Sequence, residues 1–145
     1  MAKYIYKLVE NEEELRGANE VRRQVFVIEQ GIAEGLVFDK SEDVDEINVV
    51  VKDENSVIGT ARVVFPVENT AKIERMAVLE NYREKGVGKG IISFLNEEFK
   101  RRKIAHIVLH AQYQVIDFYR ICGFRESGLP FEEAGIRHVK MEMYF

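Results

Sequence analysis

Residues 72–90 read KIERMAVLENYREKGVGKG, and this stretch decides the fold. It begins as an extended run, continues into a turn that contains Gly86, Gly88 and Gly90, and leads directly into a segment with helical periodicity. Glycines let a backbone approach a ligand closely, and the free N–H groups at the start of a helix bind phosphate. The stretch therefore predicts a strand, a phosphate-binding turn and a helix. The alternative is a flexible helix entry with solvated charges.

Two other phosphate-binding motifs are excluded by the residues around these glycines. A P-loop requires Ser or Thr after its Gly-Lys, but the Gly-Lys at 88–89 is followed by another glycine. A dinucleotide fingerprint that starts at Gly86 requires a glycine at position 91, where the chain has Ile91. The remaining pattern is Arg-x-x-Gly-x-Gly, which runs from Arg83 to Gly88.

Outward from this stretch, the spacing of apolar residues predicts strands and helices along the whole chain. Strands are expected at 3–9, 47–52, 57–65, 70–79, 104–111 and 138–145, and helices at 11–28, 88–102 and 115–122. Residues 30–46 are expected to form a loop with room for a short helix. Strands cluster early and alternate with helices late, so we expect an α/β fold with a central mixed sheet.

Helix 11–28 is expected to bury one face against this sheet, with Asn11 as its N-cap. Its apolar stripe consists of Leu15, Ala18, Val21, Val25 and Ile28. The turn that precedes the strand at 70–79 is expected at residues 66–69, where the chain has a proline.

Length and composition are those of an ordinary globular protein. The chain has 145 residues, 46% hydrophobic and 32% charged, which predicts a single domain over residues 1–145 with one substantial core. A net charge of −4 argues against a nucleic-acid partner and against an anionic membrane surface. There is no run of 18 apolar residues, and the acidic N-terminal stretch does not read as a signal peptide. The only cysteine is Cys122, so we expect a cytoplasmic protein without an intramolecular disulfide.

Two motifs resemble those of the GNAT superfamily of N-acetyltransferases. The pyrophosphate loop of that family follows Arg/Gln-x-x-Gly-x-Gly/Ala, which residues 83–88 match after a Met-Ala-Val triplet at 76–78. A second family signature, Phe-Tyr-x-x-x-Gly-Phe, is matched without gaps by residues 118–124. Residues 25–30 (VFVIEQ) and 135–138 (GIRH) are also similar to a subgroup of small, ElaA-like GNAT proteins. The resemblance covers nearly the whole chain.

The resemblance implies a GNAT-like fold, in which a twisted, mostly antiparallel mixed sheet is flanked by helices. It implies an acetyl-CoA-dependent N-acetyltransferase that needs no metal and moves the acetyl group to a primary amine by direct transfer in a ternary complex. The acceptor would be an amine of a small molecule or peptide, with a protein lysine also open, and a homodimer would be consistent with many relatives. The alternative is a sensor or interaction module that binds CoA or acyl-CoA without turnover.

The resemblance also assigns residues to the cofactor. The strand would pair with the pantetheine arm like an added strand, and the loop would hold the pyrophosphate through backbone N–H groups and the helix dipole. The implied set is Met76, Ala77, Val78, Arg83, Glu84, Lys85, Gly86, Val87, Gly88, Lys89, Gln112 and Tyr119. Gln112 stands where the family often has Asn, and Arg137 stands where related proteins usually have Pro.

Acetyl transfer to an amine needs a group that accepts a proton and a group that helps the thiolate leave. A lysine-like amine has a pKa of about 10.4, so deprotonation at pH 7.4 costs about 4 kcal/mol. Glu74 is one candidate base, because strict alternation would place the even-numbered residues of 72–78 on one face of the strand. Glu29 is the second candidate base. For each of the two, the alternative is a surface carboxylate without a catalytic role. Tyr119 is the candidate donor to the leaving sulfur, with core packing as the alternative.

Other polar groups carry less information. His106 and His110 are four residues apart on an expected strand, about 13 Å, which is too far to bind one metal ion. No spacing of Cys or His indicates zinc. His138 is expected to be structural, or to lie near the acceptor. The acidic loops at 30–46 and 127–137 would attract a cationic amine if they border the cleft.

Overall fold

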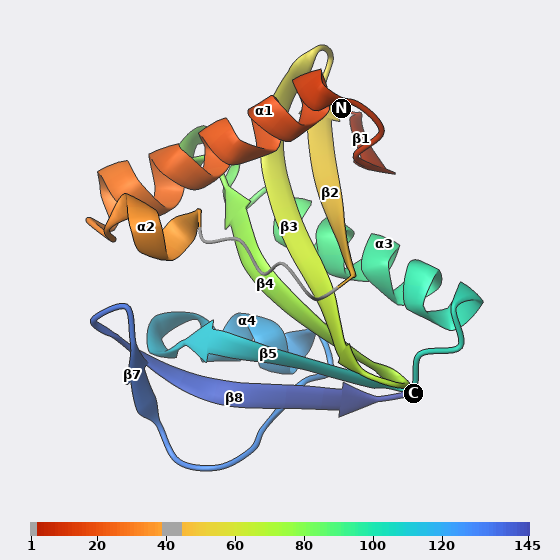
Figure 1. The fold of residues 1–145 in the computed structure, drawn as a ribbon. Helices are drawn as coiled ribbons and strands as arrows, with labels where there is room; N and C mark the ends of the chain where they lie inside the picture. The colour runs from red at the N-terminus through yellow and green to blue at the C-terminus, as the bar shows by residue number, and fades with distance from the viewer. Residues whose placement is uncertain (1–2, 39–44) are drawn as a thin grey trace.

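The computed structural model describes residues 3–38 and 45–145, which form a twisted sheet with helices on both faces (Figure 1). The strands are β1 Tyr4–Leu8, β2 Glu46–Asp53, β3 Ser56–Val67, β4 Thr70–Val78, β5 His106–Gln112, β6 Arg125–Glu126, β7 Phe131–Glu133 and β8 Ile136–Tyr144. The helices are α1 Glu12–Arg22, α2 Glu34–Val37, α3 Val87–Arg101 and α4 Ile116–Ile121, with a π-helix η1 Arg23–Glu29 and 3-10 turns η2 Glu80–Tyr82 and η3 Tyr113–Val115. Within the described ranges, no helix has the length and hydropathy needed to cross a bilayer.

The sheet is mixed and mostly antiparallel, which confirms the predicted fold class. Its strand order is β1-β2-β3-β4-β5-β8-β6, with β7 added to β8. Among the described strands, only β4 and β5 are parallel neighbours, and their ladder is short, since residues 70–73 pair with residues 106–109. Beyond this ladder the two strands diverge toward their C-terminal ends (Figure 1). We call the resulting gap the fork between β4 and β5.

Two hydrophobic clusters hold the helices on the sheet. The α3-side cluster contains Leu95 and Phe99, both fully buried, together with inward-facing residues of β2 to β5 and β8. The α1-side cluster places Val21 and Val25 against Ala77 of β4. Full burial of a large apolar side chain stabilises the folded state by about 1.5–3 kcal/mol. Tertiary packing of these apolar stripes therefore outweighs intrinsic helix propensity in fixing α1 and α3.

The N-terminal helix begins as predicted and then departs from the expected stripe. The side chain of Asn11 caps α1 by accepting a hydrogen bond of 2.8 Å from the backbone N–H three residues on. Three of the five predicted stripe residues are buried, but Leu15 is 37% and Ile28 is 65% exposed, so the prediction is wrong for these two. From Arg23 onward the helix is π-helical, and its wider turn brings Phe26 inward and turns Ile28 outward.

Strand β4 contains a bulge that changes which side chains face the two clusters. Between Glu74 and Ala77 the pairing advances three residues on β4 but only two on β3. Arg75, inside the bulge, has φ 51°, which lies in the left-handed region. As a result, Ile73 belongs to the α3-side cluster, whereas Ala77 belongs to the α1-side cluster. The expectation that the even-numbered residues of 72–78 share one face is therefore wrong, because a bulge reverses the alternation.

Local details near chain reversals also differ from the predictions. Pro66 lies within β3, and the turn before β4 is formed by residues 68–69, with Asn69 at φ 63°. The short helix expected between 30 and 46 is α2. The sequence does not predict strands β6 and β7, since two and three residues are too few to show an alternating pattern.

Candidate active site

The fork opens into a cavity of about 1150 Å³. One wall consists of residues from η1, α2 and the part of β4 beyond the ladder, and the opposite wall comes from β5, α4 and the β7–β8 hairpin. The turn that leads into α3 closes one end. Because the ladder ends at Ile73, the backbone of β4 inside the cavity has an edge that β5 does not cover. Such an edge can hydrogen-bond an extended ligand.

The turn before α3 gathers groups that attract an anion. Gly86 has φ 82°, and a side chain there would meet no atom within 4 Å, so the space beside it is open. The first N–H groups of a helix have no carbonyl partner within it, and the side chains of Arg83 and Lys89 also line the cavity. Gly88 has a different role, because a Cβ there would lie 2.9 Å from Cζ of Phe118. It lets α4 pack closely on α3.

Most residues that the sequence assigned to the cofactor line this cavity. They are Met76, Ala77, Val78, Arg83, Glu84, Gly86, Val87, Gly88, Lys89, Gln112 and Tyr119. Lys85 is not among the lining residues, and its ammonium lies 5.6 Å from the ring centroid of Tyr82. Gln112 donates a 2.8 Å hydrogen bond to Gln30, which joins the end of β5 to the end of η1 across the cavity.

Glu74 lies in the cavity wall, but cationic side chains neutralise it. Its carboxylate accepts a hydrogen bond of 2.6 Å from Arg62 and lies 3.2 Å from the ammonium of Lys72. Burial by itself would raise the pKa of Glu74, but these two cations hold the pKa below its usual range. The carboxylate is therefore a stabilised anion with a reduced tendency to accept a proton.

Glu29 occupies a different position from Glu74. It does not line the cavity, and its carboxylate accepts a 2.8 Å hydrogen bond from Arg83. The same guanidinium donates to the backbone carbonyl of Val78 at 3.0 Å. Glu29 therefore fixes the side chain of Arg83 beside β4, and the structure does not bring the two predicted base candidates together.

Tyr119 lies in the cavity wall between two phenylalanines. Its ring makes edge-to-face contacts with Phe118 and Phe124, with centroid separations of 5.0 and 5.9 Å. Burial raises the pKa of Tyr119, and the nearby Cys122 adds to this effect. Burial also raises the pKa of the Cys122 thiol, which is consistent with a packing role for this side chain. The Tyr119 hydroxyl therefore keeps its proton and is suited to donate a hydrogen bond.

Comparison with known proteins identifies the family. Residues 36–145 match the profile described as Acetyltransferase (GNAT) domain. The chain belongs to the GNAT acetyltransferase family. It is 38% identical over 137 residues to the uncharacterized protein YyaT of Bacillus subtilis (strain 168), which covers 93% of this chain and 92% of YyaT. The family membership and the sequence similarity to YyaT extend over the fork, the turn before α3 and α4.

Solved structures show the same fold. Escherichia coli ElaA superposes with a TM-score of 0.83 at 22% identity, covering 99% of each chain, so the resemblance to ElaA-like GNAT proteins is confirmed. The PaiA N-acetyltransferase of Thermoplasma acidophilum, whose structure is a complex with coenzyme A, superposes with a TM-score of 0.74 at 16% identity. That superposition covers 97% of this chain and 99% of PaiA. Because the chain belongs to the GNAT acetyltransferase family, it is an acyltransferase by family.

Several residues that line the cavity of this GNAT protein are not predicted from the sequence. Apolar side chains of η1, α2 and the segment between them form part of one wall: Val25, Phe26, Ile32, Leu36 and Val37. His110 and Glu133 line the opposite wall together with His138. The acidic loop at 127–137 therefore does reach the cavity through Glu133, whereas residues 39–44 of the other acidic loop lie outside the described residues. The only signal for His110 in the sequence is its position on a strand that leads to the cavity.

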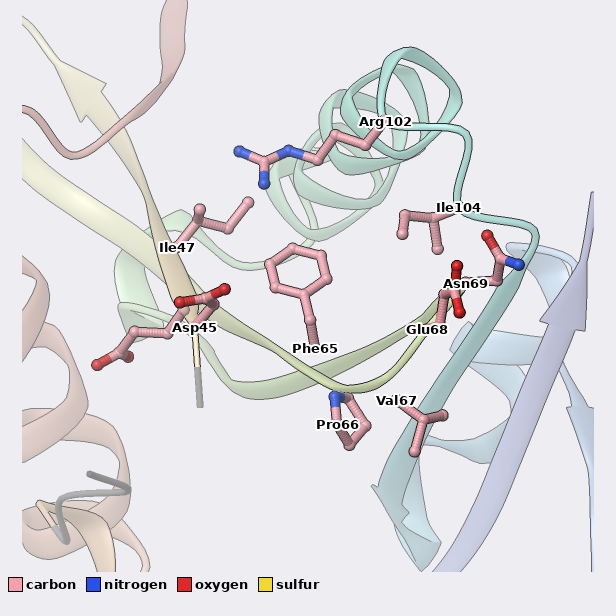
Figure 2. A pocket seen from close by; sticks show the side chains of 10 residues that line it. Asp45, Ile47, Phe65, Pro66, Val67, Glu68, Asn69, Arg102 and Ile104 are labelled. Carbon is pink, nitrogen blue, oxygen red and sulfur yellow. The ribbon is translucent and has the colours of Figure 1, made fainter. Parts of the chain in front are cut away.

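A second hollow, of about 730 Å³, lies near the N-terminal ends of β2 and β4 (Figure 2). Phe65 points into it between Ile47 and Ile104, and the guanidinium of Arg102 lies 5.3 Å from the centroid of its ring. Most of the residues assigned to cofactor or catalysis line the fork, and this hollow shares no lining residue with it. Across the described chain, no three His, Cys, Asp or Glu side chains form a metal-binding group.

Proposed function

We propose that this GNAT protein is an N-acetyltransferase that moves an acetyl group from acetyl-CoA to a primary amine by direct transfer in a ternary complex. One observation carries the proposal. A single cavity combines the anion-binding turn before α3, an uncovered edge of β4 and the hydroxyl-bearing ring of Tyr119. These are the three parts needed to hold a pyrophosphate, an extended pantetheine arm and a thioester in one line.

The residues present fit CoA along this cavity. Open space beside Gly86, the N–H groups of the first turn of α3 and the charges of Arg83 and Lys89 suit the pyrophosphate. Backbone groups of Met76 and Val78 lie beyond the end of the β4–β5 ladder, where an extended arm would pair like an added strand. The CoA complex of the similarly folded PaiA supports this assignment.

The chain would contribute to catalysis mainly by holding the reactants in position. Alignment of two bound reactants is worth about 7–11 kcal/mol. Acetyl-CoA would supply an activated acetyl thioester, and Tyr119 would hold a proton near its sulfur. A phenol with a pKa near 10 is a weaker acid than a thiol with a pKa near 8.5, and burial raises the pKa of Tyr119 further. We therefore assign Tyr119 the role of a hydrogen-bond donor to the sulfur.

The test measures binding and turnover separately. CoA is titrated into the protein by calorimetry, and release of free thiol from acetyl-CoA is followed with n-butylamine, lysine, spermidine and a short peptide with a free N-terminus. Saturable CoA binding and amine-dependent thiol release are expected. Binding without release in any mixture would favour a CoA sensor, and the absence of binding would refute the assignment of the fork as the CoA site.

A further inference from the structure

His110 and Glu133 form a pair in the cavity wall that none of the roles above uses. We propose that His110, oriented by Glu133, is the general base that takes the proton from the acceptor amine. This inference rests on the proposed function, because it names the proton acceptor of the same site. It is carried by the contact between the two side chains and by their position in the cavity wall, with His110 directly beyond the end of the β4–β5 ladder.

The geometry of the pair leaves one ring nitrogen for a ligand. Nδ1 of His110 lies 2.9 Å from Oε1 of Glu133. A carboxylate only accepts, so Nδ1 donates to it, and in the neutral imidazole the lone pair is then on Nε2. In the part of the chain that the structure describes, Nε2 has no hydrogen-bond partner, and the side chain is 29% exposed. An imidazole oriented in this way by a carboxylate is the arrangement that serves general bases elsewhere.

His110 lies inside the cavity at the point where β4 and β5 separate. The β4–β5 ladder ends with the pair Ile73 and Leu109, so His110 is the first residue of β5 beyond it. On β4 the corresponding first residue is Glu74, whose carboxylate is already paired with Arg62. Imidazole is the side chain that most often accepts a proton near neutral pH, and the hydrogen bond of His110 is to the Glu133 carboxylate.

Strand β7 fixes both members of the pair. The ring of Phe131 meets His110 edge-on at 5.0 Å and stacks on His138 at 6.0 Å. Nδ1 of His138 donates to the carbonyl of Ile136 at 2.8 Å, and its Nε2 lies 3.8 Å from Oε2 of Glu133. His138 is 6% exposed, so its ring is held between Phe131 and the backbone beside Glu133. We assign Glu133 and His138 as positioning residues.

The proton and bond changes balance without a further reactant. An ammonium acceptor gives one proton to Nε2 of His110, which leaves a neutral amine and an imidazolium ion paired with Glu133. The amine nitrogen then forms the C–N bond as the C–S bond breaks. The nitrogen loses its second proton as the amide forms, and the sulfur gains one proton. Release of the His110 proton to solvent restores the starting state.

The experiment compares His110→Gln with His106→Gln. His106 offers a matched control, because it lies on β5 like His110 but outside the cavity. Its Nε2 lies 2.7 Å from the carboxylate of Glu142, so it too is paired with a glutamate. At pH 7 the kcat of His110→Gln should fall by about 10²-fold with an unchanged Kd for CoA. The loss should narrow to roughly tenfold or less by pH 9.5, because the amine then increasingly loses its proton to solvent unaided. A purely structural defect would not narrow with pH.

The pH profile also depends on the charges near His110. These are Lys72 and Glu74 on β4, Glu133 on β7, and His138 and Lys140 on β8.

Glu133→Gln is a second variant that tests the pair if His110→Gln does not fold. Glu133 lies on the exposed β7–β8 hairpin, and its replacement should lower kcat by about tenfold. An active wild type combined with an unchanged rate and pH profile in His110→Gln would overturn the inference. A pH-dependent loss of kcat in Glu74→Gln that is larger than the loss in His110→Gln would also overturn it. A wild type that releases no thiol would instead refute the proposed function, and this inference with it.

Discussion

At the residue scale, the hydroxyl of Tyr119 is the group whose removal is most informative. Its ring is fixed by Phe118 and Phe124, so Tyr119→Phe should keep the packing and leave the Kd for CoA unchanged within about twofold. Because burial raises the pKa of Tyr119, the hydroxyl should act as a hydrogen-bond donor to sulfur rather than as a full acid. Such a bond to a charged group is worth about 1.5–3 kcal/mol, so kcat should fall by about 10- to 100-fold. Thiol-release kinetics measure this.

Tyr113→Phe provides the control, because Tyr113 is exposed and its ring stacks under the guanidinium of Arg137 instead of lining the cavity. Its kcat should stay within twofold of the wild type. If Tyr119→Phe also kept its kcat under conditions where chemistry limits the rate, Tyr119 would be a packing residue only. Water would then donate the hydrogen bond to the leaving thiolate.

At the scale of elements, α3 packs closely on β1 where Gly90 faces Tyr6. A Cβ at Gly90 would overlap the ring of Tyr6, so Gly90→Ala must displace this ring or push the helix and the strand apart. Overpacking of this kind costs about 1–3 kcal/mol of folding free energy, which urea unfolding measures. Gly35→Ala in α2 is the control, since a Cβ at that position would meet no atom within 4 Å, and its stability should be unchanged or slightly higher. Equal stability of the two variants would contradict the close contact between α3 and β1.

At the scale of the whole molecule, one buried carboxylate joins three elements. Glu14 of α1 is 3% exposed and lies 2.6 Å from the ammonium of Lys7 on β1 and 2.8 Å from that of Lys52 on β2. Hydrogen bonds from Lys52 and Lys7 lower the pKa of Glu14 to about 2. A carboxylate with a lowered pKa stabilises the fold above its unfolded pKa of 4.5, and this stabilisation is lost as the pH falls from about 5 to 2.

Glu14→Gln should therefore lower Tm by several degrees at pH 7, and the gap to the wild type should narrow steadily between pH 5 and pH 2. Thermal unfolding followed by circular dichroism measures both effects. Glu97→Gln is the control, because Glu97 is exposed and lies 3.8 Å from Lys100. Its Tm should equal that of the wild type across this pH range. If the difference in Tm between Glu14→Gln and the wild type did not change with pH, side-chain packing rather than charge would link the three elements.

The sequence carries enough local information to predict the turn before α3 and the mixed sheet, because glycine spacing and apolar periodicity are local signals. The bulge at Arg75 is not predictable in this way, since no glycine or asparagine marks its positive φ. The contact between His110 and Glu133 spans 23 residues and depends on a three-residue strand that shows no alternation. The pairing of Glu29 with Arg83 likewise arises only when η1 meets the turn before α3.

The fork has a consequence for self-association. An uncovered strand edge is ordinarily a hazard, because a second protein chain can add its own strand there and start aggregation. In this molecule the uncovered edge of β4 faces β5 across the cavity, inside the sheet instead of at its rim. Residues of η1, α2, α4 and the β7–β8 hairpin line the same cavity, so another chain would reach this edge only through it. The geometry that provides a slot for an extended ligand therefore also keeps this uncovered backbone away from the rim of the sheet, where other copies of the chain would add a strand.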